Sequence, residues 1–216
     1  MPIEAKICGL TTADAVDAAV AGGAAMCGFV FFPPSPRALT PEAAAPLIGR
    51  VPDGVARVGL SVDADNALLA AMIEVGGVDT LQLHGHESVA RVAEVKARFG
   101  VPVIKVLPIA GADDVAAARA YEDVADRLMF DAKPPKDATR PGGNAVAFDW
   151  TLLAGETWSK PWILAGGLTP ENVALAVRAS GASAVDVSSG VEDAPGRKNL
   201  NKIAGFLAAV KALSSQ

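Results

Sequence analysis

Eight short apolar runs, each closed by Gly, Pro, Ser or Asp, recur along the chain at an average spacing of about 26 residues. They cover residues 3–9, 26–32, 56–62, 80–85, 101–109, 127–133, 162–167 and 184–190. Each interval is long enough for a loop, a helix and the start of the next strand, which is what a connection between parallel strands needs. No repeated sequence accompanies the spacing, so it indicates a repeating structure.

The intervals carry Ala-rich patterns typical of helices, at residues 13–21, 67–75, 89–98, 115–121 and 172–179. Thr12, Thr40 and Thr169 are expected to cap three of the helices, the last two followed by a proline at the first helical position. Strands that alternate with helices and are apolar on both faces indicate a parallel sheet. Eight of them favour an α/β fold of the (β/α)8 TIM-barrel type, with a parallel eight-stranded core; the alternative is an open doubly wound sheet.

Composition supports one folded unit. Hydrophobic residues make up 51% of the 216 residues, and the mean hydropathy is +0.32, so the chain can build a large core. Barrels of this length are usually one domain, and no linker or low-complexity tract divides the sequence. A single (β/α)8 barrel domain over residues 1–216 is therefore expected.

Charge and cysteine content exclude several classes of protein. The 19 basic and 24 acidic residues give a formal net charge of −5, which disfavours a nucleic-acid partner. Cys8 and Cys27 are too few for a disulfide scaffold and lack the paired spacing of a zinc site. The sequence shows neither a secretory leader nor an apolar stretch long enough to span a bilayer. We expect a cytoplasmic protein with no membrane partner.

The expected strands seven and eight end in small residues. In barrels of this kind the reactive groups lie at the carboxyl ends of the strands, and a phosphate is often bound between the last two loops. Both strands are expected to lead towards a helix start, where backbone NH groups left open by small residues suit an anion. We therefore predict a phosphate-binding site, with ordinary capped turns as the alternative. Its residues are Gly166, Gly167, Ser188, Ser189 and Gly190.

Two further strand ends carry groups suited to proton transfer. Cys8 ends the first strand, and Lys6, two residues earlier, shares its face, so an ammonium should favour the thiolate and depress the pKa of the thiol. Asp131 ends the sixth strand and is either a structural hydrogen-bond acceptor or an acid–base group. Cys27 lies inside the second strand and is expected to be a core residue.

Arg37 and His84 are the remaining polar candidates near strand ends. Arg37 follows Pro36 and is either a solvated loop charge or a guanidinium aimed at a carboxylate. His84 and His86 have no carboxylate at ligand spacing, so we predict no metal site and expect His84 to contact substrate or to be satisfied within the protein. The polar stretch at 133–144 is too long for a simple connection and is a candidate lid.

The motifs at these strand ends resemble those of phosphoribosylanthranilate isomerases of tryptophan biosynthesis. The resemblance spans residues 3 to about 212 and rests on six strands. The matching segments on five of these strands are Lys6-Ile7-Cys8-Gly9-Leu10-Thr11, Gly28-Phe29-Val30-Phe31 with Ser35-Pro36-Arg37, Gln82-Leu83-His84-Gly85, Ile163-Leu164-Ala165-Gly166-Gly167-Leu168, and Asp186-Val187-Ser188-Ser189-Gly190-Val191-Glu192.

The resemblance implies an enzyme that performs an Amadori rearrangement. It converts N-(5-phosphoribosyl)anthranilate, an aminoaldose, to 1-(2-carboxyphenylamino)-1-deoxyribulose 5-phosphate, an intramolecular aldose–ketose isomerisation without cofactor or metal. Carried over by motif, Cys8 is the general base, Asp131 is the general acid and Arg37 lies near the anthranilate carboxylate. The glycine and serine loops of strands seven and eight match the phosphate site. The resemblance thus implies that the protein binds a small phosphorylated substrate. A monomer or a weak homodimer is expected.

Two positions depart from the family pattern. Asn199 stands after the Pro-Gly-x-Lys stretch, where the family usually has aspartate, and this puts a contact at the start of the following helix in doubt. Asn144 follows Gly142-Gly143, where Gly-Gly-Thr-Gly is common, and this puts the closure of the loop in doubt. Neither departure affects Cys8 or Asp131.

Three other functions compete. A sugar-phosphate epimerase or another phosphosugar barrel would need metal-ligating histidines and carboxylates at several strand ends, and these are missing. A related synthase acting on the isomerase product would be expected to carry catalytic lysine and glutamate at strand ends, and Lys105 alone does not make that case. A barrel that only binds a phosphorylated ligand has no use for Cys8 and Asp131 together.

The period-two alternation of the strands also predicts a buried ion pair. Lys6 on the first strand and Asp186 on the eighth both have the phase that points into the barrel. The two strands become neighbours when the barrel closes. Because a buried charge needs a partner, Lys6 and Asp186 are expected to lie close together.

Overall fold

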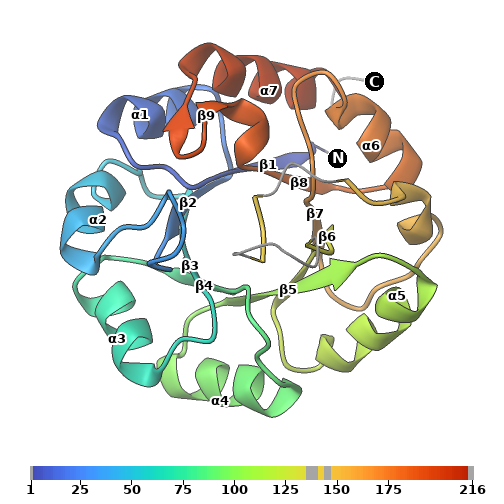
Figure 1. Cartoon of the computed structure of the whole chain (residues 1–216), viewed down its shortest axis with the longest axis horizontal. Helices are drawn as coiled ribbons and strands as arrows, with labels where there is room; N and C mark the ends of the chain where they lie inside the picture. Colours follow the sequence, from blue (N-terminus) through green and yellow to red (C-terminus); the bar gives the residue numbers. More distant parts are fainter. Residues whose placement is uncertain (1, 135–140, 144–146, 214–216) are drawn as a thin grey trace.

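The computed structural model of the protein describes residues 2–134, 141–143 and 147–213. Eight parallel strands pair in chain order, and β1 pairs with β8, so the sheet closes into a barrel (Figure 1). The predicted (β/α)8 TIM barrel is confirmed, and the open doubly wound alternative is wrong. The barrel strands are β1 (Glu4–Cys8), β2 (Met26–Val30), β3 (Ala56–Ser61), β4 (Thr80–Leu83), β5 (Val103–Ile109), β6 (Arg127–Ala132), β7 (Trp162–Leu164) and β8 (Ala184–Val187).

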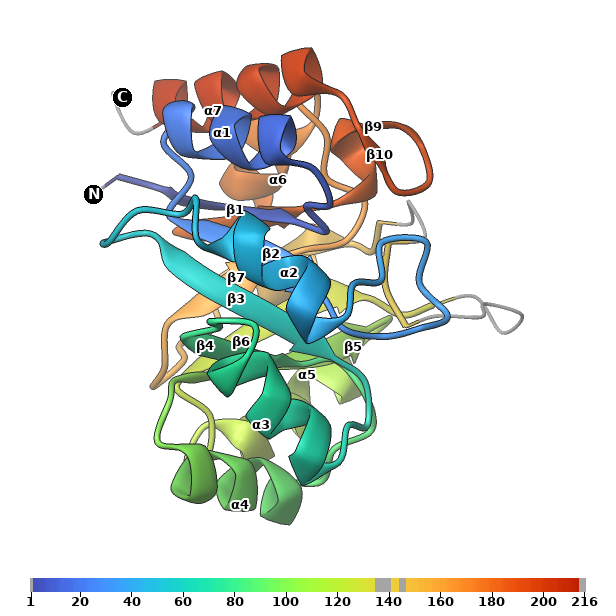
Figure 2. The same cartoon turned by 90° about the vertical axis from the view of Figure 1, so that its left-hand side faces the viewer.

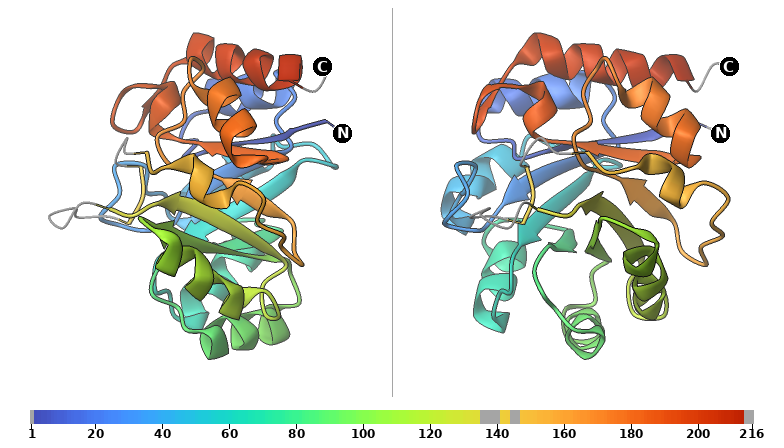
Figure 3. Two further views of the ribbon diagram at one scale, coloured as in Figure 1. Left: turned by 90° about the vertical axis from the view of Figure 1, so that its right-hand side faces the viewer. Right: turned by 45° about the vertical axis from the view of Figure 1, so that its right-hand side comes forward.

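Helices cover the outside of the barrel, as the side views in Figures 2 and 3 show. Three short 3-10 turns, η1 (Arg119–Tyr121), η2 (Trp150–Leu153) and η3 (Ser189–Val191), and a small hairpin of β9 (Glu192–Ala194) and β10 (Arg197–Lys198) supplement them. None of the described helices is long and apolar enough to cross a membrane. The helices are α1 (Ala13–Ala21), α2 (Pro41–Ile48), α3 (Asn66–Glu74), α4 (Val89–Phe99), α5 (Ala112–Ala118), α6 (Val173–Ser180) and α7 (Leu200–Leu213).

Two of the three predicted helix caps are confirmed. The side chains of Thr12 and Thr40 accept hydrogen bonds from backbone NH groups in the first turns of α1 and α2. The Thr169 hydroxyl accepts from the NH groups of Glu171 and Asn172 at 3.2 and 3.3 Å, but it caps a turn and not the helix itself, because α6 begins only at Val173. Asn172 explains the delay: its side chain accepts from the Thr169 NH at 2.8 Å and donates to the Gly167 carbonyl at 2.9 Å. These bonds hold the segment as a turn that belongs to the loop after β7.

The barrel is filled with apolar side chains both inside the ring of strands and between the strands and the helices. Residues on the outward faces of the strands pack with the helices in one large cluster. A second cluster lies inside the barrel and consists of Met26, Val58, Ile104, Val106, Met129, Ile163, Ala165 and Ala184. Because the interior is filled, ligands reach the strands from their ends, and the functional groups collect where the strands finish.

Lys6 and Asp186 form the predicted ion pair inside the barrel. The two residues are partners in the register of β1 and β8, and Nζ donates to the Asp186 carboxylate at 2.8 Å. Lys6 is completely buried and Asp186 is 9% exposed. Gly28 on β2 leaves room for the ammonium, since a Cβ at this position would lie 2.9 Å from Nζ. The seam that closes the barrel is thus held by a buried charge pair.

The ion pair at this seam predicts how single and double substitutions of Lys6 and Asp186 change the free energy of unfolding. Lys6→Met and Asp186→Leu should each lower the free energy of unfolding by roughly 3–5 kcal/mol, because each leaves a buried charge without its partner. The double variant Lys6→Met/Asp186→Leu should be more stable than either single variant, because it leaves no uncompensated charge. Urea unfolding measures all three. A double variant whose loss equals the sum of the single losses would show that the two groups do not act as a pair.

Candidate active site

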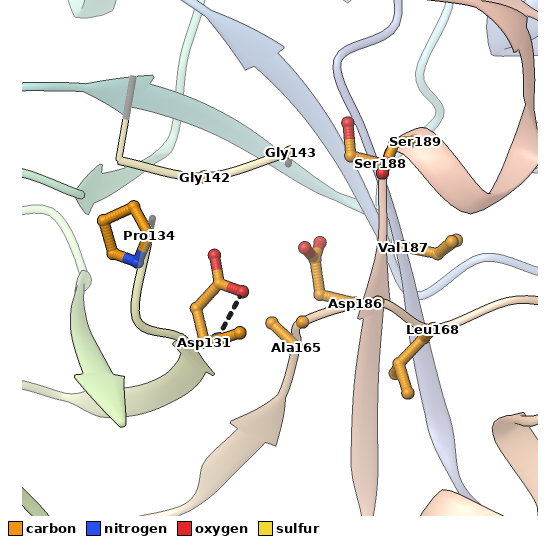
Figure 4. Close-up of a pocket in the computed structure, with 13 residues that line it drawn as sticks. Asp131, Pro134, Gly142, Gly143, Ala165, Leu168, Asp186, Val187, Ser188 and Ser189 are labelled. Atoms are coloured by element: carbon orange, nitrogen blue, oxygen red, sulfur yellow. Dashed lines mark hydrogen bonds between the residues drawn. The ribbon is translucent and has the colours of Figure 1, made fainter. Parts of the chain in front are cut away.

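The predicted functional residues converge on two adjoining pockets where the strands end. The polar pocket lies among the ends of β6, β7 and β8 (Figure 4), and the apolar pocket lies over β1 to β4. Asp131 and Asp186 line both pockets, and their carboxylates point into the same space in Figure 4. Gly142 and Gly143 also line both. An elongated ligand can therefore occupy both pockets with its middle at these two carboxylates.

The polar pocket is walled by the loops after β7 and β8, as the sequence predicts. Gly166, Gly167, Ser188 and Ser189 line it. Both glycines have positive φ, +87° and +66°, and a Cβ on Gly166 would lie 2.7 Å from the Ala132 nitrogen. Side chains are therefore excluded, and backbone atoms form the surface. No lysine or arginine lines this pocket within the described chain.

Two details of the predicted phosphate loop differ in the structure. Gly190 does not line the pocket; a Cβ there would lie 1.9 Å from the Leu168 carbonyl oxygen, so this glycine allows the two loops to pack together. The helix start predicted directly after strand eight is wrong, because the chain forms only the three-residue turn η3. Any anion here is held by loop NH groups and not by the end of a long helix.

Asp131 projects from the end of β6 to the boundary of the pockets. Its Oδ1 accepts a hydrogen bond from the Ala132 NH at 2.8 Å, drawn dashed in Figure 4. Its Oδ2 lies 3.3 Å from Nε2 of His84, at the end of β4. His84 lines the apolar pocket, so the predicted substrate contact is within its reach. One carboxylate oxygen is thus fixed by the backbone while the other faces His84 and the cavity.

Cys8 lies at the end of β1, lines the apolar pocket and is 4% exposed. Gly28 again makes the room, because a Cβ there would lie 3.1 Å from Sγ as well as 2.9 Å from the Lys6 ammonium. Lys6 and Cys8 therefore share one face of β1, as predicted. The thiol is in position to meet a ligand that spans both pockets.

The predicted depression of the thiol pKa is wrong for the ligand-free protein. Burial raises the pKa of Cys8 above its ordinary value, Lys6 opposes this increase, and the Asp186 carboxylate adds to it. Burial would lower the pKa of Lys6, but Asp186 and Cys8 raise it above its usual value, so this group stays an ammonium. The prediction from the sequence considered the Lys6 cation alone. It left out the Asp186 carboxylate and the burial of the thiol, which both raise the pKa of Cys8.

Arg37 is buried, so its interpretation as a solvated loop charge is wrong. It is 3% exposed, and its Nε and Nη2 each donate to the Glu192 carboxylate at 2.7 Å. Its side chain crosses Gly9, where φ is +76° and a Cβ would lie 2.4 Å from Cδ of Arg37. The guanidinium nevertheless lines the apolar pocket. A buried, oriented arginine at an apolar cavity suits a planar carboxylate.

Sequence reasoning missed several groups around this site. Glu192 was noted only as the last residue of the strand-eight motif, Lys198 only within the Pro-Gly-x-Lys stretch, and Asp186 only in the strand-eight motif and as the partner of Lys6. Gln82 lines the floor of the apolar pocket, and its buried Oε1 has no hydrogen-bond partner in the described part of the chain. The signal available for Gln82 was its inward phase next to His84, since an amide inside an apolar barrel needs a reason to be there.

Other candidates lie away from the pockets. Lys105 points to the outside of the barrel, where its Nζ donates to Glu87 at 2.6 Å, and this removes the synthase alternative. The side chain of His86 is exposed and contacts Asp63. Within the described ranges, no three His, Cys, Asp or Glu side chains gather as a metal site would require.

The two departures from the family pattern have different outcomes. Asn199 retains the contact at the start of α7, because its Oδ1 accepts from the Lys202 NH at 3.0 Å and its amide donates to Asp193. Asn144 lies outside the described residues, as do residues 135–140 of the candidate lid. Gly142 and Gly143, from the same stretch, line both pockets and lie above the Asp131 carboxylate in Figure 4.

The balance of charges around the thiol predicts how Cys8 reacts with an alkylating reagent. In a Cys27→Ala background, the rate of iodoacetamide alkylation should rise only above the ordinary thiol range of about 8.5. Cys27 is removed because burial raises its pKa to about 11 and would confuse the profile. Lys6→Met should move the profile to still higher pH, because the cation that favours the thiolate is lost.

Lys105→Met is the matched control for that experiment. It also removes a buried lysine that pairs with a carboxylate, but on the outside of the barrel. It should leave the alkylation profile unchanged. A profile that moves equally in both variants, or toward lower pH in Lys6→Met, would contradict the assigned influence of Lys6.

Comparison with known proteins agrees with the geometry. The family model described as N-(5'phosphoribosyl)anthranilate (PRA) isomerase matches residues 5–209. A relative from Paramagnetospirillum magneticum, named N-(5'-phosphoribosyl)anthranilate isomerase, is 56% identical over 211 residues, which are 98% of each chain. The resemblance found in the motifs therefore extends over almost the whole length of both proteins.

Solved structures give the same result. The crystal structure of phosphoribosyl anthranilate isomerase from Thermotoga maritima superposes with a TM-score of 0.87 at 33% identity, covering 97% of this chain and 99% of that one. A phosphoribosyl anthranilate isomerase in complex with reduced 1-(o-carboxyphenylamino)-1-deoxyribulose 5-phosphate superposes with a TM-score of 0.84 at 31% identity, with the same coverage. The chain belongs to the N-(5'-phosphoribosyl)anthranilate isomerase family.

Proposed function

We propose that this protein isomerises N-(5'-phosphoribosyl)anthranilate to 1-(2-carboxyphenylamino)-1-deoxyribulose 5-phosphate in tryptophan biosynthesis. The observation that carries this proposal is the pair of adjoining pockets, one polar and one apolar, that meet at Asp131 and Asp186 with Cys8 beside them. The substrate has the same plan, with a phosphate at one end, an aromatic ring at the other and the reacting sugar carbons between them. A relative of this family binds a reduced form of the product.

Each end of the substrate matches one pocket. The phosphate fits the polar pocket, where the loop backbones at Gly166, Gly167, Ser188 and Ser189 offer NH groups. The anthranilate ring fits the apolar pocket, which has Val30, Phe32, Leu60 and Val62 in its wall. Its carboxylate then reaches Arg37. This orientation puts the ribose between Cys8 and Asp131, which come from strands on different sides of the barrel.

The reaction needs one acid and one base on different atoms of the ribose. Asp131 donates a proton to the ring oxygen, the C1–O bond breaks, and the nitrogen lone pair forms an iminium at C1. Cys8 as thiolate then removes the proton from C2, and those electrons form the C1–C2 double bond while nitrogen regains its lone pair. Proton transfer from the C2 hydroxyl to C1 gives the ketone. C2 is oxidised and C1 reduced within one molecule.

The raised thiol pKa is compatible with this role for Cys8. In the ligand-free protein the thiolate is the minor form near neutral pH, because burial outweighs the influence of Lys6. The iminium formed after ring opening carries a positive charge beside Sγ, and a nearby cation favours the thiolate. The base is therefore generated where and when the C2 proton must be removed.

We propose further properties of the whole chain. Residues 1–216 form one catalytic domain that works without metal or cofactor. Val75, Leu175 and Leu200 are the large hydrophobic side chains that are strongly exposed in the described part, and they belong to three different helices or helix ends. A monomer or weak homodimer fits this surface, and a net charge of −5 fits a cytoplasmic protein without a nucleic-acid partner.

The acid and base assignments predict the behaviour of three variants. Cys8→Ala and Asp131→Asn should each lower kcat by roughly 10²–10⁴-fold, the usual effect of losing a general base or acid, with little change in ligand binding. Cys8→Ser should be severely impaired because a hydroxyl does not supply the anion near neutral pH. The assay follows loss of substrate fluorescence, with and without a chelator.

The same assignments predict a bell-shaped pH profile for kcat/KM. The reaction needs a thiolate at Cys8 and a proton on the general acid at the same time, so activity falls at both extremes of pH. Full activity of Cys8→Ala or Asp131→Asn would reject the mechanism. Loss of activity with the chelator would reject the metal-free reaction.

The phosphate site predicts that the enzyme strongly prefers a substrate that carries the phosphate over one that lacks it. Preformed backbone NH groups bind an anion with little ordering cost, so much of the binding free energy should come from the phosphate. N-ribosylanthranilate should therefore have a kcat/KM on the order of 10²-fold below that of the phosphorylated substrate. Steady-state kinetics with both compounds measures the ratio, and equal values would remove the assignment of the β7 and β8 loops.

A further inference from the structure

Arg37, Glu192 and Lys198 form a buried ion cluster beside the apolar pocket. Arg37 donates through Nε and Nη2, each at 2.7 Å, to the two oxygens of Glu192. Lys198 donates to the same carboxylate at 2.7 Å. The three side chains are at most 4% exposed. The Glu192 carboxylate thus pairs with two cations, Arg37 and Lys198, and all three groups are buried.

The hairpin of β9 and β10 connects this cluster to three loops of the site. Gly196, with φ of +82°, lies so close to the β2 loop that a Cβ would be 2.5 Å from the Pro36 carbonyl oxygen, and its own carbonyl accepts from the Thr11 hydroxyl. Lys198 donates to the Ser188 carbonyl at 2.9 Å. The hairpin therefore ties Arg37 to the polar pocket through Ser188.

The charges of the cluster leave a place for one more anion. Two cations and one carboxylate carry a net positive charge, whereas Lys6 and Asp186 nearby neutralise each other. Glu192 occupies the Nε edge of the guanidinium, and Nη1 lies under Gly143, 2.7 Å from where its Cβ would be. The outer edge of Arg37 therefore faces the mouth of the apolar pocket.

Glu192 also favours the charged form of Lys198. Burial lowers the pKa of Lys198, and the Glu192 carboxylate opposes this shift. Burial alone would raise the pKa of Glu192, but Arg37 and Lys198 bring it below its usual range. Removing the carboxylate would leave two buried cations facing each other and release the guanidinium from its fixed orientation.

We propose that Glu192 and Lys198 are positioning residues that aim Arg37 and so make the enzyme selective for aryl amines that carry a carboxylate next to the amine. This inference rests on the proposed function, since it concerns the same substrate. An arginine fixed along one edge loses little rotamer freedom on binding, so its bond to the carboxylate contributes more to affinity. The alternative is a cluster that only staples the hairpin to the barrel.

Two substrates separate selectivity from stability. N-(5-phosphoribosyl)anthranilate and N-(5-phosphoribosyl)aniline differ only in the carboxylate, and chromatography of quenched reactions follows both. The wild-type protein should prefer the anthranilate by on the order of 10²-fold or more in kcat/KM, because a site built for a charged hydrogen bond rejects an analogue that lacks it. Glu192→Gln and Lys198→Met should lower this preference at least tenfold, mainly through the KM of the anthranilate substrate, with the aniline substrate changed less than about threefold.

Glu87→Gln is the matched control. Glu87 is a buried carboxylate that pairs with a lysine on the outside of the barrel, so its loss should lower stability and leave the preference unchanged. If Glu192→Gln does not fold, Glu192→Asp keeps the charge, shortens its reach by one methylene and should also lower the preference. An unchanged preference in the folded Glu192 variant, or an equal loss on both substrates, overturns the inference. A wild-type protein that turns over neither substrate overturns the proposed function instead.

Discussion

The ion pair of Lys6 and Asp186 is the interaction on which the rest of the structure depends. A charge inside a barrel needs a partner, and these two residues meet only if β1 and β8 lie side by side, so the pair marks the closure of the sheet. Asp186 also lines both pockets, and Lys6 shares its face of β1 with Cys8. Gly28 is needed next to both groups, because a Cβ would crowd the ammonium and the thiol. Closure of the fold and construction of the site therefore use the same atoms.

Much of this could be predicted from the sequence because it depends on local periodicity. Alternation along a strand sets which residues point inward, and parallel strands all end on one side, so Cys8, Asp131 and the two glycines of the β7 loop could be assigned to one site. The pairing of Lys6 with Asp186 followed from the same alternation once the barrel was assumed. These inferences need only the phase of each strand and the order of strands.

The predictions that were wrong, and the residues that were missed, depend on the balance of opposing effects or on contacts between residues far apart in the sequence. The direction of the Cys8 pKa shift depends on burial, the Lys6 cation and the Asp186 anion together, and only coordinates give their balance. Arg37 and Glu192 are 155 positions apart. They are brought together by the β9–β10 hairpin, which no local sequence pattern had indicated. The Thr169 hydroxyl does accept from the NH of Asn172, but the Asn172 side chain bonds back to the Thr169 NH and closes a turn before α6 begins at Val173.

The distribution of charge in the site bears on how the substrate is oriented. Asp131 and Asp186 both line the polar pocket, and no described cation lines it with them. Asp186 is neutralised by Lys6, whereas the described contacts of Asp131 are a backbone NH and His84. A phosphate dianion in this pocket would find backbone NH groups and no described side-chain cation, so the geometry of the β7 and β8 loops decides whether it binds. The cations of the site lie instead on the side of β1 and of the β9–β10 hairpin, where Lys6 faces Asp186 and where Arg37 and Lys198 share Glu192. The proposed orientation of the substrate follows from this asymmetry, because its carboxylate has a cation to meet only in the apolar pocket, which Arg37 lines.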